Sequence, residues 1–159
     1  MLSEYPTSAA STYERFVIEH GPRLRRALVA RFGVEIGIEV ANDALAQAWA
    51  RWAEVSTMQN PIGYLFRIAQ SAARPHFRWR SRVSLVPPTD RTEFDRYDDG
   101  LIDALARLSD AQRVAVLLVH GHGYSYAEVA DVLGVSTSAV TNHVHRGLTA
   151  LRRHFGGSR

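Results

Sequence analysis

The sequence predicts an all-α protein of two small helical domains joined by a flexible acidic linker, with a helix-turn-helix in the C-terminal domain. Apolar residues recur at helical spacing in residues 11–80 and 100–155, and serines that can cap helices precede several of these segments. A glycine, Gly134, separates two short amphipathic segments. The 159 residues can bury one good core or two small ones. No apolar run reaches the length of a membrane span, so we expect no membrane insertion.

The first predicted helix covers residues 11–31. Ser11 and Glu14 have the spacing of a capping box, in which each side chain satisfies a free N–H group at the helix start. Gly33 and Gly37 then bracket a short connection, because glycine readily adopts the backbone conformations in which helices end.

Two further helices are expected in the N-terminal domain. The second runs from about Ile38 to Val55, with Trp49 on its apolar stripe. Asn60, which precedes a proline, marks the start of the third. That helix should end or kink near Arg74, because Pro75 lacks an N–H group and crowds the preceding turn.

Charge is strongly segregated along the chain, although the net charge is only +3. Residues 67–82 hold five arginines and no acid, whereas residues 90–110 hold seven acids and three arginines. Residues 140–159 hold four arginines and no acid. Two basic segments separated by an acidic one predict two places where a polyanion such as DNA can lie. The candidate phosphate-binding residues of the first segment are Arg67, Arg74, Arg78 and Arg80.

We place the first domain at residues 11–82, the linker at 83–99 and the second domain at 100–155. Consecutive prolines and the loss of helical periodicity mark the linker. Phe77 and Trp79 lie among the arginines that precede it, where they would either stack on unpaired bases or pack into the core.

The second domain carries the helix-turn-helix pattern. Ser109 and Ser125 each begin a capping box, Gly134 ends the first helix of the motif, and Ser136 caps the second. A second helix that is apolar on one face and polar on the other is typical of a helix that enters the DNA major groove. Its early residues should reach base edges, and Arg146 should contact phosphate or the groove wall. Its candidate DNA-binding residues are Ser136, Thr137, Ser138, Thr141, Asn142, His145 and Arg146.

The composition argues against catalytic and metal sites. The chain has no cysteine, so it has no disulfide and no thiolate ligand, and we expect a reducing, cytoplasmic location. His143 and His145 point about 160° apart on a helix, so they cannot face one ion. No catalytic spacing or phosphate loop stands out. We therefore expect no enzyme activity, no cofactor and no metal.

Three stretches resemble the bacterial sigma factors of the extracytoplasmic-function (ECF) group. The second domain contains ALARLSDAQRVAVLLVHGHGYSYAEVADVLGVSTSAV, which resembles the family's L-P-x-x-x-R-x-V-x-x-L followed by G-x-S-Y-x-E-I-A-x-x-L-G-V. The first domain contains IEVANDALAQAW and NPIGYLFRIAQ, which resemble D-L-V-Q-E-T-F-L-x-A-W and N-P-x-x-W-L-Y-R-I-A. The resemblance covers nearly the whole chain. It implies a promoter-specificity subunit whose first domain binds polymerase and the −10 element and whose second domain reads the −35 element.

The same resemblance implies partners and a polymerase site. Asn42 and Asp43 stand where the family uses Gln-Glu to touch the polymerase clamp. The implied partners are core RNA polymerase, promoter DNA and an anti-sigma factor. Ser71 and Pro75 depart from the family, which usually has Asn and Asp at these places in the part that handles the −10 element.

Two other functions compete with this interpretation. V-x-N-H-V-x-R, from Val140 to Arg146, also resembles the recognition helix of response-regulator output modules, so a helix-turn-helix regulator that is no sigma subunit is the first alternative. A phospho-receiver domain would need alternating strands and helices, whereas residues 11–80 have helical periodicity throughout. The second alternative is a protein-interaction module that keeps the fold and binds no DNA.

Overall fold

The computed structural model describes the backbone of residues 7–77 and 99–157 and the side chains of residues 9–73 and 100–157. Every regular element in these residues is a helix, which confirms the all-α class, and none of these helices is long and apolar enough to cross a membrane. The predicted linker lies outside the described residues except for Asp99. The elements are α1 (Thr7–Phe32), α2 (Val34–Ala50), α3 (Trp52–Val55), α4 (Pro61–Phe77), α6 (Asp99–Ala106), α7 (Asp110–Val116), the π-helical turn η1 (Leu117–Gly121), α8 (Tyr126–Leu133) and α9 (Thr137–Gly156).

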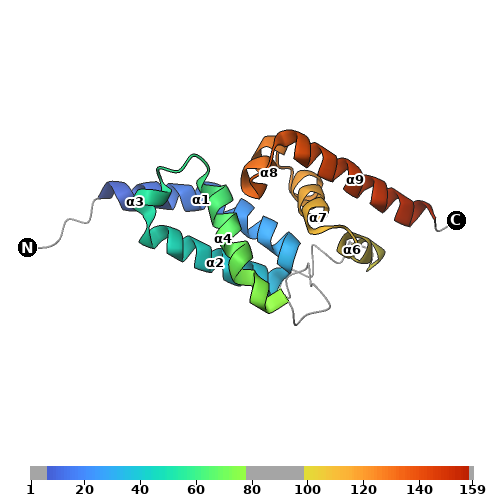
Figure 1. The fold of residues 1–159 in the computed structure, drawn as a ribbon, viewed down its shortest axis with the longest axis horizontal. Coiled ribbons are helices and arrows are strands. Elements are labelled where there is room, and N and C mark those ends of the chain that lie inside the picture. Colours follow the sequence, from blue (N-terminus) through green and yellow to red (C-terminus); the bar gives the residue numbers. More distant parts are fainter. Residues whose placement is uncertain (1–6, 78–98, 158–159) are drawn as a thin grey trace, which may run out of the picture.

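The helices form an N-terminal half, α1–α4, and a C-terminal half, α6–α9. The start of α1 and the end of α9 lie at opposite ends of the longest axis, and the two halves meet between them (Figure 1). Helix α1 contacts α7, η1 and α8, and α4 contacts α8.

Helices α1 and α2 are joined by a single residue, Gly33. Its φ of 85° is a left-handed conformation that glycine adopts without steric cost. Gly37 lies inside α2 rather than in the connection, and a Cβ there would lie 2.6 Å from the backbone nitrogen of Val29 on α1. The two helices therefore cross with their backbones in contact. Ser11 also lies inside a helix, because α1 begins at Thr7, so the predicted capping box at Ser11 is wrong. The alanines before Ser11 are strong helix formers and extend α1 by a turn.

The predicted second helix is divided into α2 and α3 at Arg51, where φ is −123°. Trp52 directly follows this break and is buried. Its indole N–H donates to the hydroxyl of Thr12 on α1 at 3.0 Å. The break therefore coincides with the docking of α3 on α1.

Helix α4 begins where the sequence predicts it. The side-chain oxygen of Asn60 accepts a hydrogen bond from the backbone N–H of Gly63 at 3.0 Å, so Asn60 caps the helix. The helix then continues through Pro75 to Phe77, so of the two predicted outcomes, an end or a kink near Arg74, the end is wrong. Proline removes one helical hydrogen bond, and the turn that follows remains helical.

The C-terminal half follows its predicted local signals closely. The capping boxes at Ser109 and Ser125 are both present, and each serine hydroxyl accepts from the N–H group three residues on. Gly134 ends α8 in the left-handed conformation with φ 65°, and Ser136 caps α9. These caps fix the turn between α8 and α9, so the two helices and the glycine turn between them lie where the sequence predicts them.

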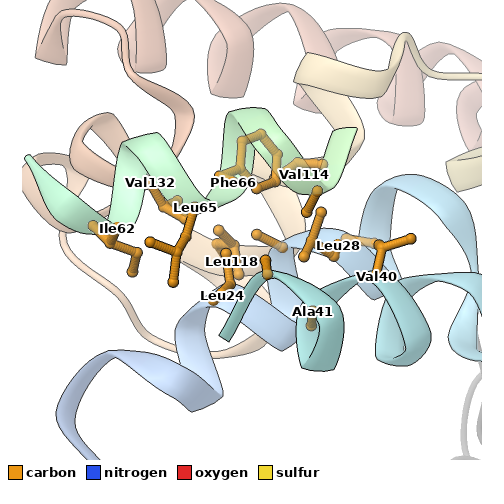
Figure 2. Close-up of a cluster of buried hydrophobic side chains, with 14 of the residues drawn as sticks. Leu24, Leu28, Val40, Ala41, Ile62, Leu65, Phe66, Val114, Leu118 and Val132 are labelled. Carbon is orange, nitrogen blue, oxygen red and sulfur yellow. The ribbon is translucent and has the colours of Figure 1, made fainter. Parts of the chain in front are cut away.

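A core shared by both halves was not predicted. Figure 2 shows side chains from α7, η1 and α8 lying among side chains from α1, α2 and α4. Leu118 and Val132 from the C-terminal half are fully buried there. Their neighbours in the N-terminal half include Leu24, Leu28, Ile62, Leu65 and Phe66. Separating the halves would therefore expose apolar surface of both.

A buried arginine, Arg113 of α7, crosses the boundary between the halves. Its guanidinium donates to the carbonyl oxygens of Ala30 at 2.7 Å and Arg31 at 3.0 Å, in the last turn of α1. It also donates to the carbonyl of Leu108 at 3.1 Å and to the carboxylate of Asp110 at 2.7 Å. Carbonyls in the last turn of a helix lack intrahelical partners, so Arg113 acts as a C-terminal cap supplied by the other half of the chain.

Further polar contacts join α1 to the start of α8. The guanidinium of Arg23 lies 3.7 Å from the carboxylate of Glu128 and also contacts the imidazole of His20 at 2.9 Å. Arg26 donates to the hydroxyl of Tyr124 at 2.6 Å. The boundary is therefore apolar at its centre and polar along one edge.

Candidate nucleic-acid interface

Helix α9 is held against the C-terminal half by one narrow face. Val140 and Val144 on that face are buried. Gly147 continues it, and a Cβ there would lie 2.6 Å from a methyl group of Val116 on α7, so the two helices approach closely. The opposite face of α9 is consequently directed to solvent.

The seven residues that the sequence predicts for DNA binding here, the cap Ser136 and six residues of α9, are all exposed. Three of their hydroxyl groups already take part in local hydrogen bonds. Ser136 accepts from the N–H of Ala139 at 3.1 Å and lies 3.0 Å from the hydroxyl of Ser138. Thr141 donates to the carbonyl of Thr137 at 3.0 Å. These hydroxyls stabilise the first turns of α9, and base recognition through them would require the local bonds to change.

Asn142, His145 and Arg146 form the remaining part of this face. They lie at helical positions i, i+3 and i+4, so their side chains share one side of α9. Within the described part of the chain, none of the three side chains has a hydrogen bond or ion pair. An amide can pair with the major-groove edge of adenine, and a guanidinium suits phosphate or guanine. These three residues therefore present an amide, an imidazole and a guanidinium to solvent on one side of α9.

The start of α8 carries a fixed negative charge. The carboxylate of Glu128 accepts from the backbone N–H of Ser125 at 2.8 Å, and this hydrogen bond lowers the pKa of Glu128. The nearby Arg23 lowers it further. Glu128 thus stays ionised as the capping-box acid and as the partner of α1 across the boundary.

The predicted basic segment of the N-terminal half is described only in part. Arg67 is exposed on α4, with its guanidinium 5.9 Å from the centre of the Tyr64 ring. Arg74 belongs to α4, but its side chain lies outside the described residues, as do Arg78 and Arg80 altogether. Arg67 is thus the member of this segment for which exposure is known.

The predicted polymerase-binding residues, Asn42 and Asp43, are exposed on α2. Two apolar side chains on the same helix were missed: Ile38 is 41% exposed and Trp49 is 47% exposed. Placement of Trp49 in the buried stripe was therefore wrong. At 100° per residue, both side chains project within about 40° of Asn42, a signal that a helical wheel could have supplied. The ring of Tyr13 lies 5.0 Å from that of Trp49 and braces it at the surface.

The described side chains contain no group of three or more His, Asp or Glu residues placed to hold a metal ion. His143 is half-buried on α9, whereas His145 is exposed. The exposed surface of α9 is polar and carries the fixed positive charge of Arg146.

Comparison with known proteins agrees with this geometry. Residues 98–151, which include α6 to most of α9, match the family described as Sigma-70, region 4. The chain is 29% identical over 126 residues to the RNA polymerase sigma-E factor of Streptomyces antibioticus, a match that covers 74% of this chain and 69% of that protein. It is 26% identical over 174 residues to the RNA polymerase sigma factor CarQ of Myxococcus xanthus, with 98% and 95% of the two chains covered.

Two solved structures share the fold across both halves. The sigma factor RpoE of Bartonella quintana, solved in complex with the anti-sigma factor NepR, has a TM-score of 0.64 at 21% identity and covers 93% of this chain and 99% of its own. CnrH, solved in complex with the cytosolic domain of CnrY, has a TM-score of 0.61 at 24% identity and covers 96% and 95%.

The all-α fold, the two C-terminal helices joined by a glycine turn and the match to sigma-70 region 4 indicate a DNA-binding regulatory protein of transcription. The region 4 match and the sigma factors that align along the chain narrow this class to the sigma factors of RNA polymerase. The chain is similar over most of its length to extracytoplasmic-function sigma factors of RNA polymerase, and it directs promoter-specific transcription initiation as a regulatory DNA-binding subunit.

Proposed function

We propose that this sigma factor reads the −35 element with α9, binds core RNA polymerase through α2, and contacts the −10 region with α4 and the residues that follow it. The face formed by Asn142, His145 and Arg146 carries the assignment to DNA. It is exposed on a helix whose start is fixed by two caps and whose opposite face is buried. A rigid helix with a free polar face is what major-groove docking requires.

The proposed polymerase surface combines Asn42 and Asp43 with Ile38 and Trp49. Exposed aromatic residues next to short polar ones are typical of the anchors of protein interfaces, because the ring gains much from leaving water. Ile38, Asn42 and Trp49 share one face of α2, and Asp43 projects about 100° further around the helix. We propose that the chain works with polymerase in the cytoplasm, needs no cofactor or metal, and carries out no chemistry of its own.

We also propose an anti-sigma factor as a partner. Both solved structures described above are complexes, one of the sigma factor RpoE with the anti-sigma factor NepR and the other of CnrH with the cytosolic domain of CnrY. The −10 contact should depend on unusual residues, because Ser71 is exposed on α4 and Pro75 lies within it.

Capture of core polymerase by the tagged full-length chain tests the proposal. The double change Asn42→Ala and Asp43→Ala should weaken capture at least about tenfold while far-UV circular dichroism stays unchanged. Asp103→Ala removes an exposed acid from α6 and serves as the control, with unchanged capture expected. If the parent chain captures no polymerase, the proposal that this surface of α2 binds core polymerase is refuted.

A further inference from the structure

Thr141 is an exposed threonine in the second turn of α9. It follows the cap Ser136 by about 7.5 Å along the helix axis, at 1.5 Å per residue. At 100° per residue, it projects about 60° from Ser138 and about 40° from His145, which are both exposed. Thr141 therefore lies in the early part of α9, and the early residues of a recognition helix are those that reach base edges.

The hydroxyl group of Thr141 is hydrogen-bonded within the helix itself. It donates to the backbone carbonyl of Thr137 at 3.0 Å, one turn earlier. Threonine is stiff about its first side-chain torsion, so a hydroxyl held in this way also fixes the methyl group on the same carbon. Because the residue is exposed while its oxygen bonds to the backbone, the methyl group is the part of Thr141 that another molecule can contact.

Contact with a base through the methyl group leaves this local bond in place, whereas contact through the hydroxyl would require the bond to Thr137 to break. The first turn of α9 is arranged in a similar way. The hydroxyl of Ser136 accepts from the N–H of Ala139 and lies 3.0 Å from the hydroxyl of Ser138. The start of α9 therefore offers a base edge more apolar surface than its serines and threonines suggest.

The turn before α9 adds another apolar group, because Val135 directly precedes the cap and is 40% exposed. In the major groove, thymine presents a methyl group, and the methyl group of threonine is one of the side-chain groups that contact it. Cytosine presents an amino donor there instead. An apolar contact at the start of α9 would therefore favour thymine over cytosine.

We propose that Thr141 selects a thymine in the DNA element that α9 reads, through contact between its methyl group and the 5-methyl group of that base. The inference rests on the proposed docking of α9 in the major groove and names one base that this helix recognises. In this role the two ends of the side chain act separately. The hydroxyl stabilises the second turn of α9, and the methyl group sets the sequence preference.

Three substitutions on α9 separate the methyl group from the hydroxyl. Thr141→Val keeps a methyl group and removes the donor, whereas Thr141→Ser keeps the donor and removes the methyl group. Valine and serine have helix propensities close to that of threonine, so α9 should form in both variants. Thr149→Ser is the matched control, because the hydroxyl of Thr149 also donates one turn back, to the carbonyl of His145 at 2.8 Å. Thr149 lies about 12 Å further along the axis, beyond the early residues of α9.

Thymine and uracil differ only by the 5-methyl group, so the contact can also be removed from the DNA. The full-length chain first selects its preferred duplex from a randomised pool. Each thymine of that duplex is then replaced in turn by uracil, and affinities are measured by fluorescence anisotropy. At one position the parent chain, Thr141→Val and Thr149→Ser should bind the thymine duplex about fourfold more tightly than the uracil duplex, the gain expected from burying one methyl group. For Thr141→Ser this ratio should fall to about one.

Each contrary result has its own meaning. A uracil effect that persists in Thr141→Ser, or that disappears in Thr149→Ser, would overturn the assignment to Thr141. Loss of the effect in Thr141→Val would show that the hydroxyl makes the contact, which also overturns the proposal. A selection that enriches no sequence, by a chain of native helical content, would refute the docking of α9 together with this inference. An enriched sequence in which no thymine is sensitive to uracil would refute this inference alone.

Discussion

Arg113→Ala should destabilise the whole chain, because this side chain joins the two halves. The guanidinium is 4% exposed and donates to three backbone carbonyls and one carboxylate. Its removal leaves the carbonyls of Ala30, Arg31 and Leu108 without this donor and creates a cavity. Breaking a buried charged network of this kind costs about 3–5 kcal/mol. Because the stability of a small domain is about 5–15 kcal/mol, a loss of this size is readily measured in urea.

The positions of the tryptophans allow the coupling to be tested directly. Trp49 and Trp52 lie on α2 and α3, so with the third tryptophan, Trp79, replaced by phenylalanine the tryptophan fluorescence reports the N-terminal half, while far-UV circular dichroism reports both halves. Arg113→Ala should move the midpoints of both signals together. Arg107→Ala, which removes an exposed arginine from the end of α6, should change stability by no more than about 0.5 kcal/mol. A tryptophan midpoint that stays fixed while the dichroism midpoint falls would refute the view that Arg113 stabilises α1.

Three further predictions concern α9 and the boundary. Asn142→Ala should alter sequence preference by about 1–3 kcal/mol at one base pair. Arg146→Ala should weaken binding to all duplexes alike and reduce its salt dependence. Fluorescence anisotropy titrations measure both effects, and exchanged outcomes for the two variants would show that α9 docks in a different register. Gly147→Ala should destabilise the chain by about 1–3 kcal/mol in thermal melts, because its Cβ would lie 2.6 Å from a methyl group of α7, and an unchanged melting temperature would show that α7 and α9 can separate freely. Burial lowers the pKa of His20 and His122 in the folded chain, so the unfolded chain binds protons first as the pH falls below about 6.5, and stability should decline from that pH downward. Urea titrations at pH 7.5 and 5.5 measure this decline, and replacement of both histidines by glutamine should reduce it; an equal decline in the double variant would assign it to other groups.

Local signals predicted the C-terminal half well. The caps at Ser109, Ser125 and Ser136 and the turn at Gly134 each depend on residues within one helical turn, so the sequence alone is sufficient. The exposed face of α9 followed from the same spacing. The capping box predicted at Ser11 had the correct local pattern and failed because helix formation could start earlier.

Long-range contacts explain what the sequence could not show. Arg113 and Asn60 each lie in a motif that resembles the family's. Their hydrogen-bond partners, the carbonyls of Ala30 and Asp131, lie 83 and 71 residues away, so neither partner could be inferred from spacing. Gly37 resembled a helix end and is a crossing point of two backbones. Trp49 was assigned to the apolar stripe of its helix, although its helical angle places it close to Asn42, on the exposed side.

The shared core has a consequence for how this chain is made. When Phe77 at the end of α4 leaves the ribosome, 55 residues remain before Val132, the last core residue of α8, can follow. At 5–20 residues per second this takes about 3–11 s. During that interval the apolar faces around Leu24 and Leu65 are uncovered and the end of α1 lacks its arginine cap. The nascent N-terminal half should therefore be a natural client of ribosome-associated chaperones, and pauses in translation between α4 and α8 should increase its aggregation.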